Sequence, residues 1–488
     1  MGEECSIQAR NSLQANLHPK AVDDKLSSEL INKRIAGPFK TPPFPNFKVS
    51  PLSIREKSEP GKFRLLHNLS YPYDSSSVNG GIPQQHKTVT YATVQTAITK
   101  INQLGKNCFL AKADIQSAYR MVPIHPSQYH LLGFKWRDNY YYDKFLPMGM
   151  AESCAIFELI SDSIVHIMHT HGIKNIVKVL DDFLILEKTQ IDCNCSLQKF
   201  IYICSELGIP LVPEKTSKSS STNITFLGVE LDTIAMTAKL PPEKLLRYGS
   251  HISSLLSAES TTLRELQTII GKLQFATCVI PVGKPFLRRL IDATKGHSVS
   301  SAIRITEEMR ADLSIWQSFL LKYNGISVIT SFRPCDSHQL GLFSDASNDG
   351  FAGIYAAQWI QGKWNSTWKL LNIAVRELYP IVALTLMFGH LWRNHSITLN
   401  CDNQAIVAVI NKHRARNPTI MILLRPLILF LMTNNIKFKA VYIKSKTNVI
   451  ADAISRFQED APLLQSYGMR PSPTPVPDHL RPEAFIQA

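Results

Sequence analysis

The chain has 488 residues, of which 44% are hydrophobic, and it carries a formal net charge of +14 at pH 7. This is enough apolar material for two or three domains with buried cores. The excess of Lys and Arg is spread along the chain, which suits a polyanionic partner such as nucleic acid. The nine cysteines form no CxxC pair, which excludes an ordinary zinc knuckle and indicates reduced thiols in the cytoplasm or nucleus.

No membrane partner is expected from the pattern of apolar residues. The N-terminal stretch MGEECSIQAR lacks the apolar core of a signal peptide. The longest apolar stretch, residues 421–432, is interrupted by Arg425 and Pro426 and is too short to cross a bilayer.

The first half of the chain is expected to hold a proline-rich lead-in and a mixed domain. Residues 1–60 are polar and indicate an N-terminal extension, in which six prolines between Pro38 and Pro60 exclude a helix. From residue 61 to residue 240, short apolar strands alternate with helical patterns, which is typical of a mixed α/β domain.

The second half divides into three segments. Residues 241–337 are expected to be mostly helical, and Thr262 and Glu265 have the spacing of a capping box at the start of an apolar helix face. Residues 338–457 are predicted to form a second α/β unit. Residues 458–488 are rich in proline and are expected to be a flexible tail.

Two adjacent aspartates, Asp181 and Asp182, interrupt the apolar stretch IVKVLDDFLIL of residues 176–186. Strand-forming residues on both sides predict a β-hairpin with carboxylates at its tip. Aspartate is also an ordinary turn residue, so this stretch alone does not separate a catalytic pair from a plain turn.

A third aspartate ends another predicted strand. In CFLAKADIQSAYR, residues 108–120, an apolar strand stops at Asp114 and a helical pattern follows. Asp114 alone suits either a metal ligand or the N-cap of the next helix. Together with Asp181 and Asp182 it predicts carboxylates that converge from two strands. Magnesium ions prefer oxygen ligands, and two ions about 4 Å apart activate an attacking oxygen and stabilise a leaving one in phosphoryl transfer.

Acidic residues are scarce in the second α/β unit, where thirteen Lys and Arg accompany five acids, a net charge of +8. Asp345 and Asp402 each end a predicted strand, Glu377 opens a helical pattern and Asp452 begins another. Asp349, in the sequence SNDG, is interpreted as a turn residue. Two strands and two helices can bring four carboxylates to one point, and the alternative is that all four are helix caps and turn residues.

Five motifs occur in the order of the reverse transcriptase palm motifs. They are Asp114, LPMGM (146–150), LDD (180–182), LGIPLVPEKT (207–216) and FLGVEL (226–231). With the second carboxylate set, the chain resembles the reverse transcriptase–RNase H region of a retroelement, most closely the DIRS type. The resemblance implies a multidomain fold of α+β and α/β type, in which a right-hand polymerase with fingers, palm and thumb precedes an RNase H-like α/β domain.

The resemblance also implies the residues of the polymerase site. Asp114 and Asp181 would hold two metal ions, and Asp182 would support them. Tyr119 matches the steric gate that excludes a 2′-hydroxyl, although it also suits a core tyrosine on a helix. The residues expected to bind nucleotide are Lys62, Arg64, Ile115, Tyr119, Met148, Gly149 and Lys215.

Several of these assignments have plainer alternatives. Lys62 and Arg64 match basic fingers residues that grip the triphosphate, yet they equally suit a solvated strand. Lys215 matches a lysine that protonates pyrophosphate, yet it equally suits an exposed surface position. Met148 and Val179 stand where the retroviral motifs have glutamine and tyrosine, which alters contacts to nucleotide and primer and leaves the metal ligands unchanged.

In the second half the resemblance is to the RNase H active site. Its metal ligands would be Asp345, Glu377, Asp402 and Asp452, again with two Mg²⁺ ions, for which Mn²⁺ can substitute. Many relatives carry a histidine shortly before the last aspartate, whereas this chain has Tyr442 and Lys444 in that stretch and no histidine. Slow product release is the expected consequence.

The expected function is an RNA-directed and DNA-directed DNA polymerase with RNase H activity. The implied partners are an RNA template, a DNA primer, the RNA–DNA hybrid and dNTPs, with a tyrosine recombinase encoded separately. Oligomeric state is not indicated. Two alternatives remain: a decayed or domesticated copy that binds nucleic acid without catalysis, and an RNA-templated RNA polymerase, which Tyr119 and the second carboxylate set oppose.

Overall fold

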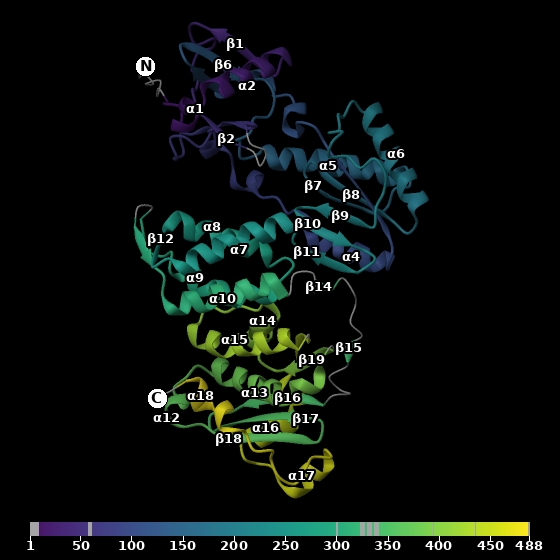
Figure 1. The fold of residues 1–488 in the computed structure, drawn as a ribbon, viewed down its shortest axis with the longest axis vertical. Coiled ribbons are helices and arrows are strands. Elements are labelled where there is room, and N and C mark those ends of the chain that lie inside the picture. Colours follow the sequence, from purple (N-terminus) through teal and green to yellow (C-terminus); the bar gives the residue numbers. More distant parts are fainter. Residues whose placement is uncertain are drawn as a thin grey trace. The chain divides into compact units, whose positions relative to one another are not determined.

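The computed structural model divides the chain into two compact units, Met1–Leu227 with Leu231–Ala235, and Gly228–Glu230 with Met236–Ala488 (Figure 1). The residues that the structure describes are 9–56, 61–298, 301–322, 327–328, 334–335, 341–393, 395–434 and 436–486.

The N-terminal part of the first unit is built from two small antiparallel sheets and two helices. One sheet has the order β1-β6-β5, and the other pairs β2 with β3. Apolar side chains from both sheets and from the helices form one core, which includes Val22, Ile54 and Phe134. The elements are α1 (Leu13–Leu17), α2 (Pro19–Ile31), β1 (Ile35–Phe39), β2 (Leu52–Glu56), β3 (Phe63–His67), β5 (Gly133–Trp136) and β6 (Asn139–Asp143).

The expected boundary between residues 60 and 61 is wrong. Strand β2 pairs with β3 across it, from Leu52 opposite His67 to Glu56 opposite Phe63. Residues 13–31 are helical rather than a separate extension, because Val22 and Leu26 of α2 supply part of the core beneath the sheets. The segment from Pro38 to Glu56 contains no helix, as its prolines predict.

A three-stranded antiparallel sheet of order β4-β8-β7 forms the centre of the first unit. Helices α5 and α6 cover it with a shared core in which Phe157, Phe183 and Phe200 are fully buried. Nearly continuous runs of apolar residues flank the Asp181–Asp182 pair, and they form the predicted β-hairpin of β7 and β8. The elements are α4 (Val94–Leu104), β4 (Phe109–Asp114), α5 (Ser153–Thr170), β7 (Ile176–Val179), β8 (Asp182–Glu187) and α6 (Gln190–Glu206).

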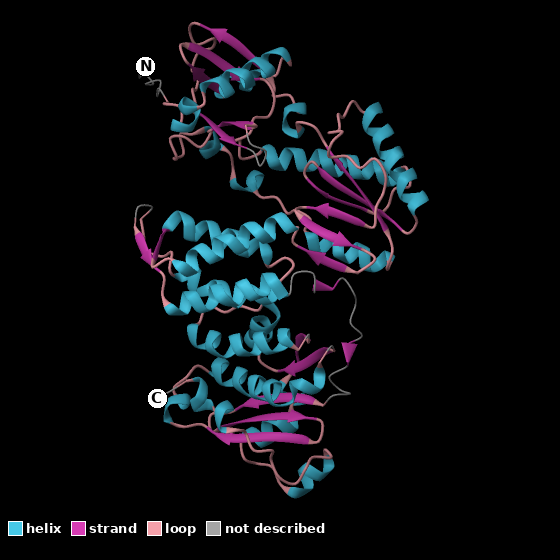
Figure 2. Ribbon diagram, viewed as in Figure 1, coloured by secondary structure: helices cyan, strands magenta, loops and turns pink. Residues whose placement is uncertain are grey.

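Short strands lead into the second unit, and helices dominate its beginning (Figure 2). The predicted capping box is present: the Thr262 hydroxyl accepts from the Glu265 backbone N–H, and the Glu265 carboxylate accepts in return from the Thr262 N–H. The elements are β9 (Asn223–Phe226), β10 (Val229–Asp232), β11 (Thr237–Lys239), α7 (Pro242–Ser257), β12 (Ser260–Thr262), α8 (Leu263–Ala276), η4 (Pro281–Leu287), α9 (Arg288–Asp292), β13 (Ala302–Arg304), α10 (Glu307–Lys322) and β14 (Ser327–Val328).

A mixed sheet follows within the same unit. It has the order β15-β19-β16-β17-β18, with β20 also paired to β19. Strands β16, β17 and β18 are antiparallel, whereas β19 runs parallel to both β16 and β20. The elements are β15 (Pro334–Cys335), β16 (Leu342–Ala346), β17 (Gly350–Tyr355), β18 (Gln358–Lys363), α12 (Ser366–Lys369), α13 (Ile373–Phe388), η5 (Gly389–Trp392), β19 (Ser396–Cys401), α14 (Gln404–Lys412), α15 (Pro418–Thr433), β20 (Lys437–Tyr442) and α16 (Val449–Ser455).

The two most apolar helices lie in the interior of this unit. Residues Ile373–Trp392 are long and apolar enough to cross a membrane, yet 72% of that stretch is buried, as in the core helix of a globular domain. The apolar stretch of residues 421–432 lies in α15, where Leu423, Leu424 and Leu427 are fully buried.

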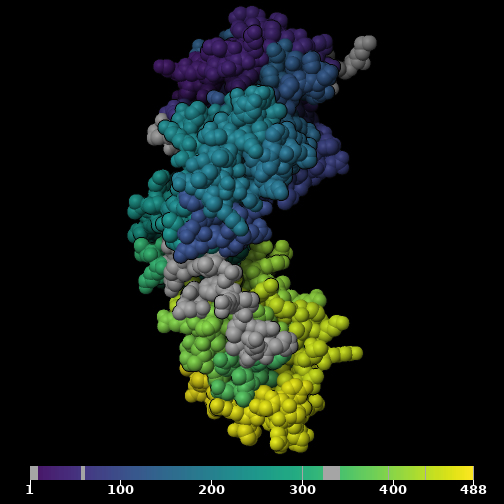
Figure 3. Space-filling view, turned by 90° about the vertical axis from the view of Figure 1, so that its right-hand side faces the viewer, coloured from purple at the N-terminus to yellow at the C-terminus, as the bar shows by residue number. Residues whose placement is uncertain are grey.

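The expected flexible tail is wrong for residues 458–486, which the structure describes as packed chain. The Trp359 indole N–H donates to the Arg470 carbonyl at 2.8 Å, and the Tyr379 hydroxyl donates to the Leu480 carbonyl at 2.8 Å. Aromatic donors of the domain therefore satisfy two carbonyls of this proline-rich segment. In Figure 3 the C-terminal residues, drawn in yellow, form a continuous surface with the green residues of the same unit. The helices are α17 (Ala461–Ser466), η7 (Asp478–Leu480) and α18 (Pro482–Phe485).

Candidate active sites

The turn of the β7–β8 hairpin presents two carboxylates. Leu180 adopts a left-handed backbone conformation with φ of 53°, which is strained for a residue with a branched side chain. The Ser161 hydroxyl of α5 donates to the Leu180 carbonyl at 2.7 Å and holds this turn. Asp181 lies in the turn, and Asp182 is the first residue of β8.

Strand pairing brings the third carboxylate to the same place. In the β4–β8 ladder Asp114 lies directly opposite Asp182, and the Ile115 N–H donates to the Asp181 carbonyl at 3.0 Å. The Asp114 side chain is buried. The predicted convergence of three aspartates from two adjacent strands is therefore present.

Negative charge at this cluster exceeds the positive charge around it. Burial raises the pKa of Asp181, and the Asp114 carboxylate raises it further, whereas Lys215 and Arg64 oppose the shift. Burial followed by Asp181 and Asp114 raises the pKa of Asp182 to about 6. Lys215 approaches from the loop after α6, and its Nζ lies 2.8 Å from Asp114 Oδ2. One buried and two partly buried carboxylates with one close lysine favour a bound cation.

Tyr119 lies beside this cluster in the 3-10 helix η2 (Ala118–Met121). Its hydroxyl is 3.0 Å from the Cys154 sulfur, and its ring meets Phe157 edge-on with centroids 5.9 Å apart. Burial and Cys154 raise the pKa of Tyr119, and the Asp181 carboxylate adds to this shift. The ring is partly buried and packs on Phe157, and the Asp181 charge acts on its hydroxyl, so this geometry accommodates both predicted roles.

The loop between β6 and α5 contains Met148 and Gly149. The Met148 carbonyl accepts from the His67 N–H at 2.8 Å. Gly149 has φ of 126°, and a Cβ there would collide with the His67 carbonyl oxygen. Only glycine fits, because both the backbone conformation and the close approach exclude a side chain.

The two basic fingers candidates lie at the start of strand β3. Lys62 immediately precedes β3, and Arg64 is within it, opposite Arg55 of β2. Both side chains are exposed. The Arg64 charge lowers the pKa of Asp181 against the larger effect of burial, which places Arg64 within electrostatic reach of the carboxylates.

A second carboxylate cluster forms in the second unit. Phe343 of β16 pairs with Asn400 of the parallel strand β19, so residues two positions further along each strand, Asp345 and Asp402, emerge side by side. Glu377 approaches from helix α13. One oxygen from each of these three side chains lies within 4.8 Å of the others.

The donor set of this cluster fits a divalent cation. Burial raises the pKa of Asp345 to about 6, despite a 2.6 Å hydrogen bond donated by the Ser455 hydroxyl. Burial, then Asp345 and Asp402, raise the pKa of Glu377 to about 9. Among the described residues, Glu377 Oε2 and Asp402 Oδ1 are buried without a hydrogen-bond partner. A cation coordinated there would satisfy both oxygens.

Asp452 lies at the margin of this cluster. Its Oδ1 accepts from Arg456 Nε at 2.8 Å, one helical turn away in α16, and 44% of its side chain is exposed. Its charge still contributes to the raised pKa of Asp345, after burial and after Asp402. The structure thus brings three of the four predicted ligands together and holds the fourth beside them in an ion pair.

Four contacts at these sites were not anticipated from the sequence. Cys154 contacts Tyr119, Ser161 holds the hairpin turn, and Ser455 and Arg456 bind the carboxylates of the second cluster. Only the Arg456–Asp452 pair carried a signal, since a residue four positions after Asp452 lies on the same helix face.

Comparison with known proteins identifies the first domain. Residues 56–231 match the family model described as reverse transcriptase (RNA-dependent DNA polymerase). The Gag-Pro-Pol polyprotein of human T-cell leukemia virus 3 (strain 2026ND) is 25% identical over 294 residues, 57% of this chain and 18% of the polyprotein. A putative enzymatic polyprotein of cassava vein mosaic virus is 21% identical over 379 residues, 72% of this chain and 53% of that protein. The chain therefore spans about half, or less, of the length of these relatives.

Solved structures share the fold. The foamy viral protease-reverse transcriptase in complex with dsDNA matches with a TM-score of 0.50 and 17% identity, over 89% of this chain and 84% of that one. The same protein in complex with an RNA/DNA hybrid matches with a TM-score of 0.50 and 17% identity, over 88% of this chain and 54% of that one. Residues 56–231 are therefore a reverse transcriptase domain of the kind found in retroelement and retroviral polyproteins, and a further α/β domain follows it in this chain.

Proposed function

We propose that the chain is an RNA-directed and DNA-directed DNA polymerase with RNase H activity, which copies the RNA of a retroelement, most like the DIRS type. The observation that carries the proposal is the meeting of Asp114, Asp181 and Asp182 at adjacent strand ends, inside the segment that matches the reverse transcriptase family. The second activity rests on the trio of buried Asp345, buried Glu377 and partly buried Asp402.

Magnesium is the proposed metal at both sites, two ions at each, and Mn²⁺ would substitute. Hard carboxylate oxygens and raised pKa values suit such ions, which compete with protons for the same oxygens. When bound, the ions supply charge stabilisation for the attacking and leaving oxygens of a phosphodiester reaction.

The side chains around the first cluster supply binding and orientation. Lys62 and Arg64 would contact the triphosphate, and the backbones of Ile115, Met148 and Gly149 would border the base and sugar. Lys215 holds a proton at Nζ within 2.8 Å of Asp114, where it can neutralise or protonate the leaving pyrophosphate. These contacts restrict the nucleotide to one orientation.

At the second cluster Asp345, Glu377 and Asp402 would hold the ions. Asp452 keeps one carboxylate oxygen beyond its contact with Arg456, and it would join the ions through that oxygen. Tyr442 is exposed at the end of β20, and no histidine lies between it and Asp452. Product release is therefore proposed to be slow.

The proposed partners are an RNA template, a DNA primer, their hybrid and dNTPs. The net charge of +14 supports binding to a phosphate backbone. The foamy viral enzyme of similar fold has been solved with dsDNA and with an RNA/DNA hybrid. A separately encoded tyrosine recombinase would complete integration, and an intracellular site of action, in cytoplasm or nucleus, accords with the reduced cysteines.

A primer-extension assay tests both halves of the proposal together. The chain is supplied with end-labelled RNA template, DNA primer, dNTPs and Mg²⁺, and the lengths of DNA and RNA are followed in one reaction. We expect extension of the DNA and shortening of the RNA, with binding that weakens steeply with salt. Tight binding of the hybrid without either reaction would support instead a domesticated nucleic-acid-binding protein.

Replacing Tyr119 by valine is expected to admit ribonucleotides. The ring would lie under the sugar, and its loss would raise the relative efficiency of ribonucleotide incorporation by roughly two orders of magnitude. The measurement compares kcat/KM for a dNTP and its ribonucleotide counterpart. Tyr119→Phe is the matched control, since it loses only the hydroxyl that contacts Cys154. Unchanged sugar discrimination in Tyr119→Val would assign Tyr119 to the core.

A further inference from the structure

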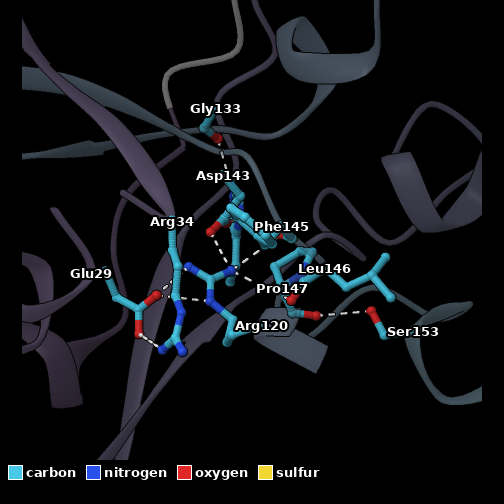
Figure 4. Close-up of polar contacts among 10 residues, drawn as sticks. Glu29, Arg34, Arg120, Gly133, Asp143, Phe145, Leu146, Pro147 and Ser153 are labelled. Carbon is cyan, nitrogen blue, oxygen red and sulfur yellow. Dashed lines mark hydrogen bonds and ion pairs between the residues drawn. The ribbon is translucent and has the colours of Figure 1, made fainter. Parts of the chain in front are cut away.

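A buried ionic network lies behind the loop that carries Met148 and Gly149, and it contains none of the catalytic carboxylates. At its centre is Arg120, the residue after Tyr119 (Figure 4). Its Nε and Nη2 donate to Glu29 Oε2 at 2.8 and 2.7 Å, and its Nη1 donates to Asp143 Oδ1 at 2.6 Å. Arg120 therefore joins helix α2 to the end of strand β6 by charge-assisted hydrogen bonds.

The same guanidinium reaches the backbone of the loop. Arg120 Nη1 also lies 3.2 Å from the Phe145 carbonyl and 3.4 Å from the Leu146 carbonyl. Every following carbonyl up to Gly149 has its own donor, so the path of this loop is fixed at five consecutive residues. The three further bonds are Ser153 Oγ to Pro147 O at 3.0 Å, His67 N to Met148 O at 2.8 Å and Asn79 Nδ2 to Gly149 O at 2.8 Å.

His67 connects the network to strand β3. Its Nδ1 is 2.9 Å from Asp143 Oδ2, and its Nε2 is 3.1 Å from the Gly133 carbonyl. Burial alone would raise the pKa of Asp143, but Arg120 and His67 outweigh burial and hold that pKa below its ordinary value. Both ring nitrogens thus lie within hydrogen-bond distance of an oxygen, and the imidazole bridges β3 to the Asp143 carboxylate and to the Gly133 carbonyl.

Removing one partner from this network would lower the stability of the fold around it, because the remaining charges are buried. The Arg120 guanidinium is largely buried, and the Asp143 and His67 side chains are 6% and 4% exposed. A buried charge that loses its partner destabilises its surroundings more than the pair stabilised them. Loss of Arg120 would therefore leave Asp143 with His67 as its remaining side-chain partner and would remove the donor that two loop carbonyls share, and the loop would shift to find others.

We propose that Arg120, with Asp143 and His67, is a positioning residue for the incoming nucleotide, because it sets both the loop of Met148 and Gly149 and the 3-10 turn of Tyr119. The inference rests on the proposed polymerase function. Arg120 does not touch the nucleotide in this proposal, and it acts through the carbonyls of Phe145 and Leu146 and through its chain neighbour Tyr119. Binding of the nucleotide, rather than metal capture or RNA cleavage, is the step that depends on it.

The test compares Arg120→Met, Arg120→Lys and Asp143→Asn with Arg137→Met. The control variant also removes an arginine–carboxylate pair to α2, that of Arg137 with Asp23, which touches no residue of the loop. Steady-state kinetics give kcat and the KM for dNTP on a fixed primer–template. Hydrogen exchange of the peptide over residues 144–152 and the rate of RNA cleavage are measured on the same preparations.

We expect Arg120→Met to raise the KM for dNTP by roughly tenfold or more, with a smaller change in kcat and unchanged RNA cleavage. Arg120→Lys should recover part of the loss, because an ammonium can pair with Asp143 but cannot also reach Glu29 and the loop carbonyls. Exchange over residues 144–152 should accelerate in Arg120→Met and remain as in the unaltered chain in Arg137→Met.

Two results would overturn the inference. One is a lower melting temperature in Arg120→Met with a dNTP KM equal to that of the unaltered chain, which would make the network structural only. The other is an equal rise in KM in Arg137→Met. If Arg120→Met does not fold, Arg120→Lys and Asp143→Asn carry the same comparison. If the unaltered chain does not extend primers, the proposed function fails, and exchange of the loop still decides whether Arg120 holds it.

Discussion

Replacing Asp181 by asparagine is expected to lower DNA synthesis by roughly three orders of magnitude while RNA cleavage stays within about twofold. The substitution keeps the size of the side chain and removes one of three negative charges that converge with Asp114 and Asp182. A neutral amide cannot offset the charge of a divalent cation, so the metal-binding capacity of this cluster falls. The measurement is the initial rate of primer extension and of template shortening in one reaction.

Asp162→Asn is the matched control for this prediction. Asp162 is an exposed carboxylate of the same unit, on helix α5, and it pairs with Lys178 outside the cluster. The control should extend primers at the unaltered rate. Loss of both activities in a folded Asp181→Asn protein would contradict the model of two independent sites, and retained synthesis would remove Asp181 from the metal ligands.

Replacing Asp402 by asparagine is expected to give the opposite pattern, with RNA cleavage reduced by roughly three orders of magnitude and DNA synthesis nearly unchanged. Asp402 belongs to the trio with Asp345 and Glu377, and its buried Oδ1 has no hydrogen-bond partner among the described residues. Its charge also raises the pKa of Glu377, after burial and Asp345. The substitution therefore relieves repulsion in the metal-free domain and weakens metal binding.

Because Asp402→Asn is expected to weaken metal binding, its effect can also be measured without an activity assay. Mg²⁺ should raise the melting temperature of the unaltered chain, because a ligand that binds the folded state stabilises it, and that increase should shrink in Asp402→Asn. Asp349→Asn is the matched control, since Asp349 is an exposed acid of the same domain in the turn before β17. Equal loss of cleavage in Asp349→Asn, or full cleavage in Asp402→Asn, would show that the trio is not the cleavage site.

The local sequence pattern was sufficient to predict the secondary-structure elements that carry the carboxylates. Apolar residues on both sides of Asp181 and Asp182 predict a hairpin with the pair at its tip, and β7 and β8 form it. The capping box at Thr262 and Glu265 was equally readable, because its partners are three residues apart. In both cases the interactions that decide the structure lie within a few residues of one another in the chain.

The N-terminal extension and the C-terminal tail were predicted wrongly, because their structure depends on residues that lie far away in the chain. Residues 13–31 and the proline-rich residues 458–486 have little pattern of their own, and each is ordered by contacts with distant parts of its unit. A polar or proline-rich composition indicates that a segment folds weakly on its own. It does not show which aromatic hydrogen-bond donors and apolar side chains elsewhere in the unit bind that segment.

The sequence by itself determined which acids could matter, because carboxylates are few in the second domain and sit at the ends of strands and helices. Only the tertiary structure decided that Asp345, Glu377 and Asp402 meet while Asp452 pairs with Arg456, since strand register and a helix approach set those distances. The Arg120 network likewise joins residues 91 and 76 positions apart. Such pairings depend on the packed chain as a whole, which local propensity does not encode.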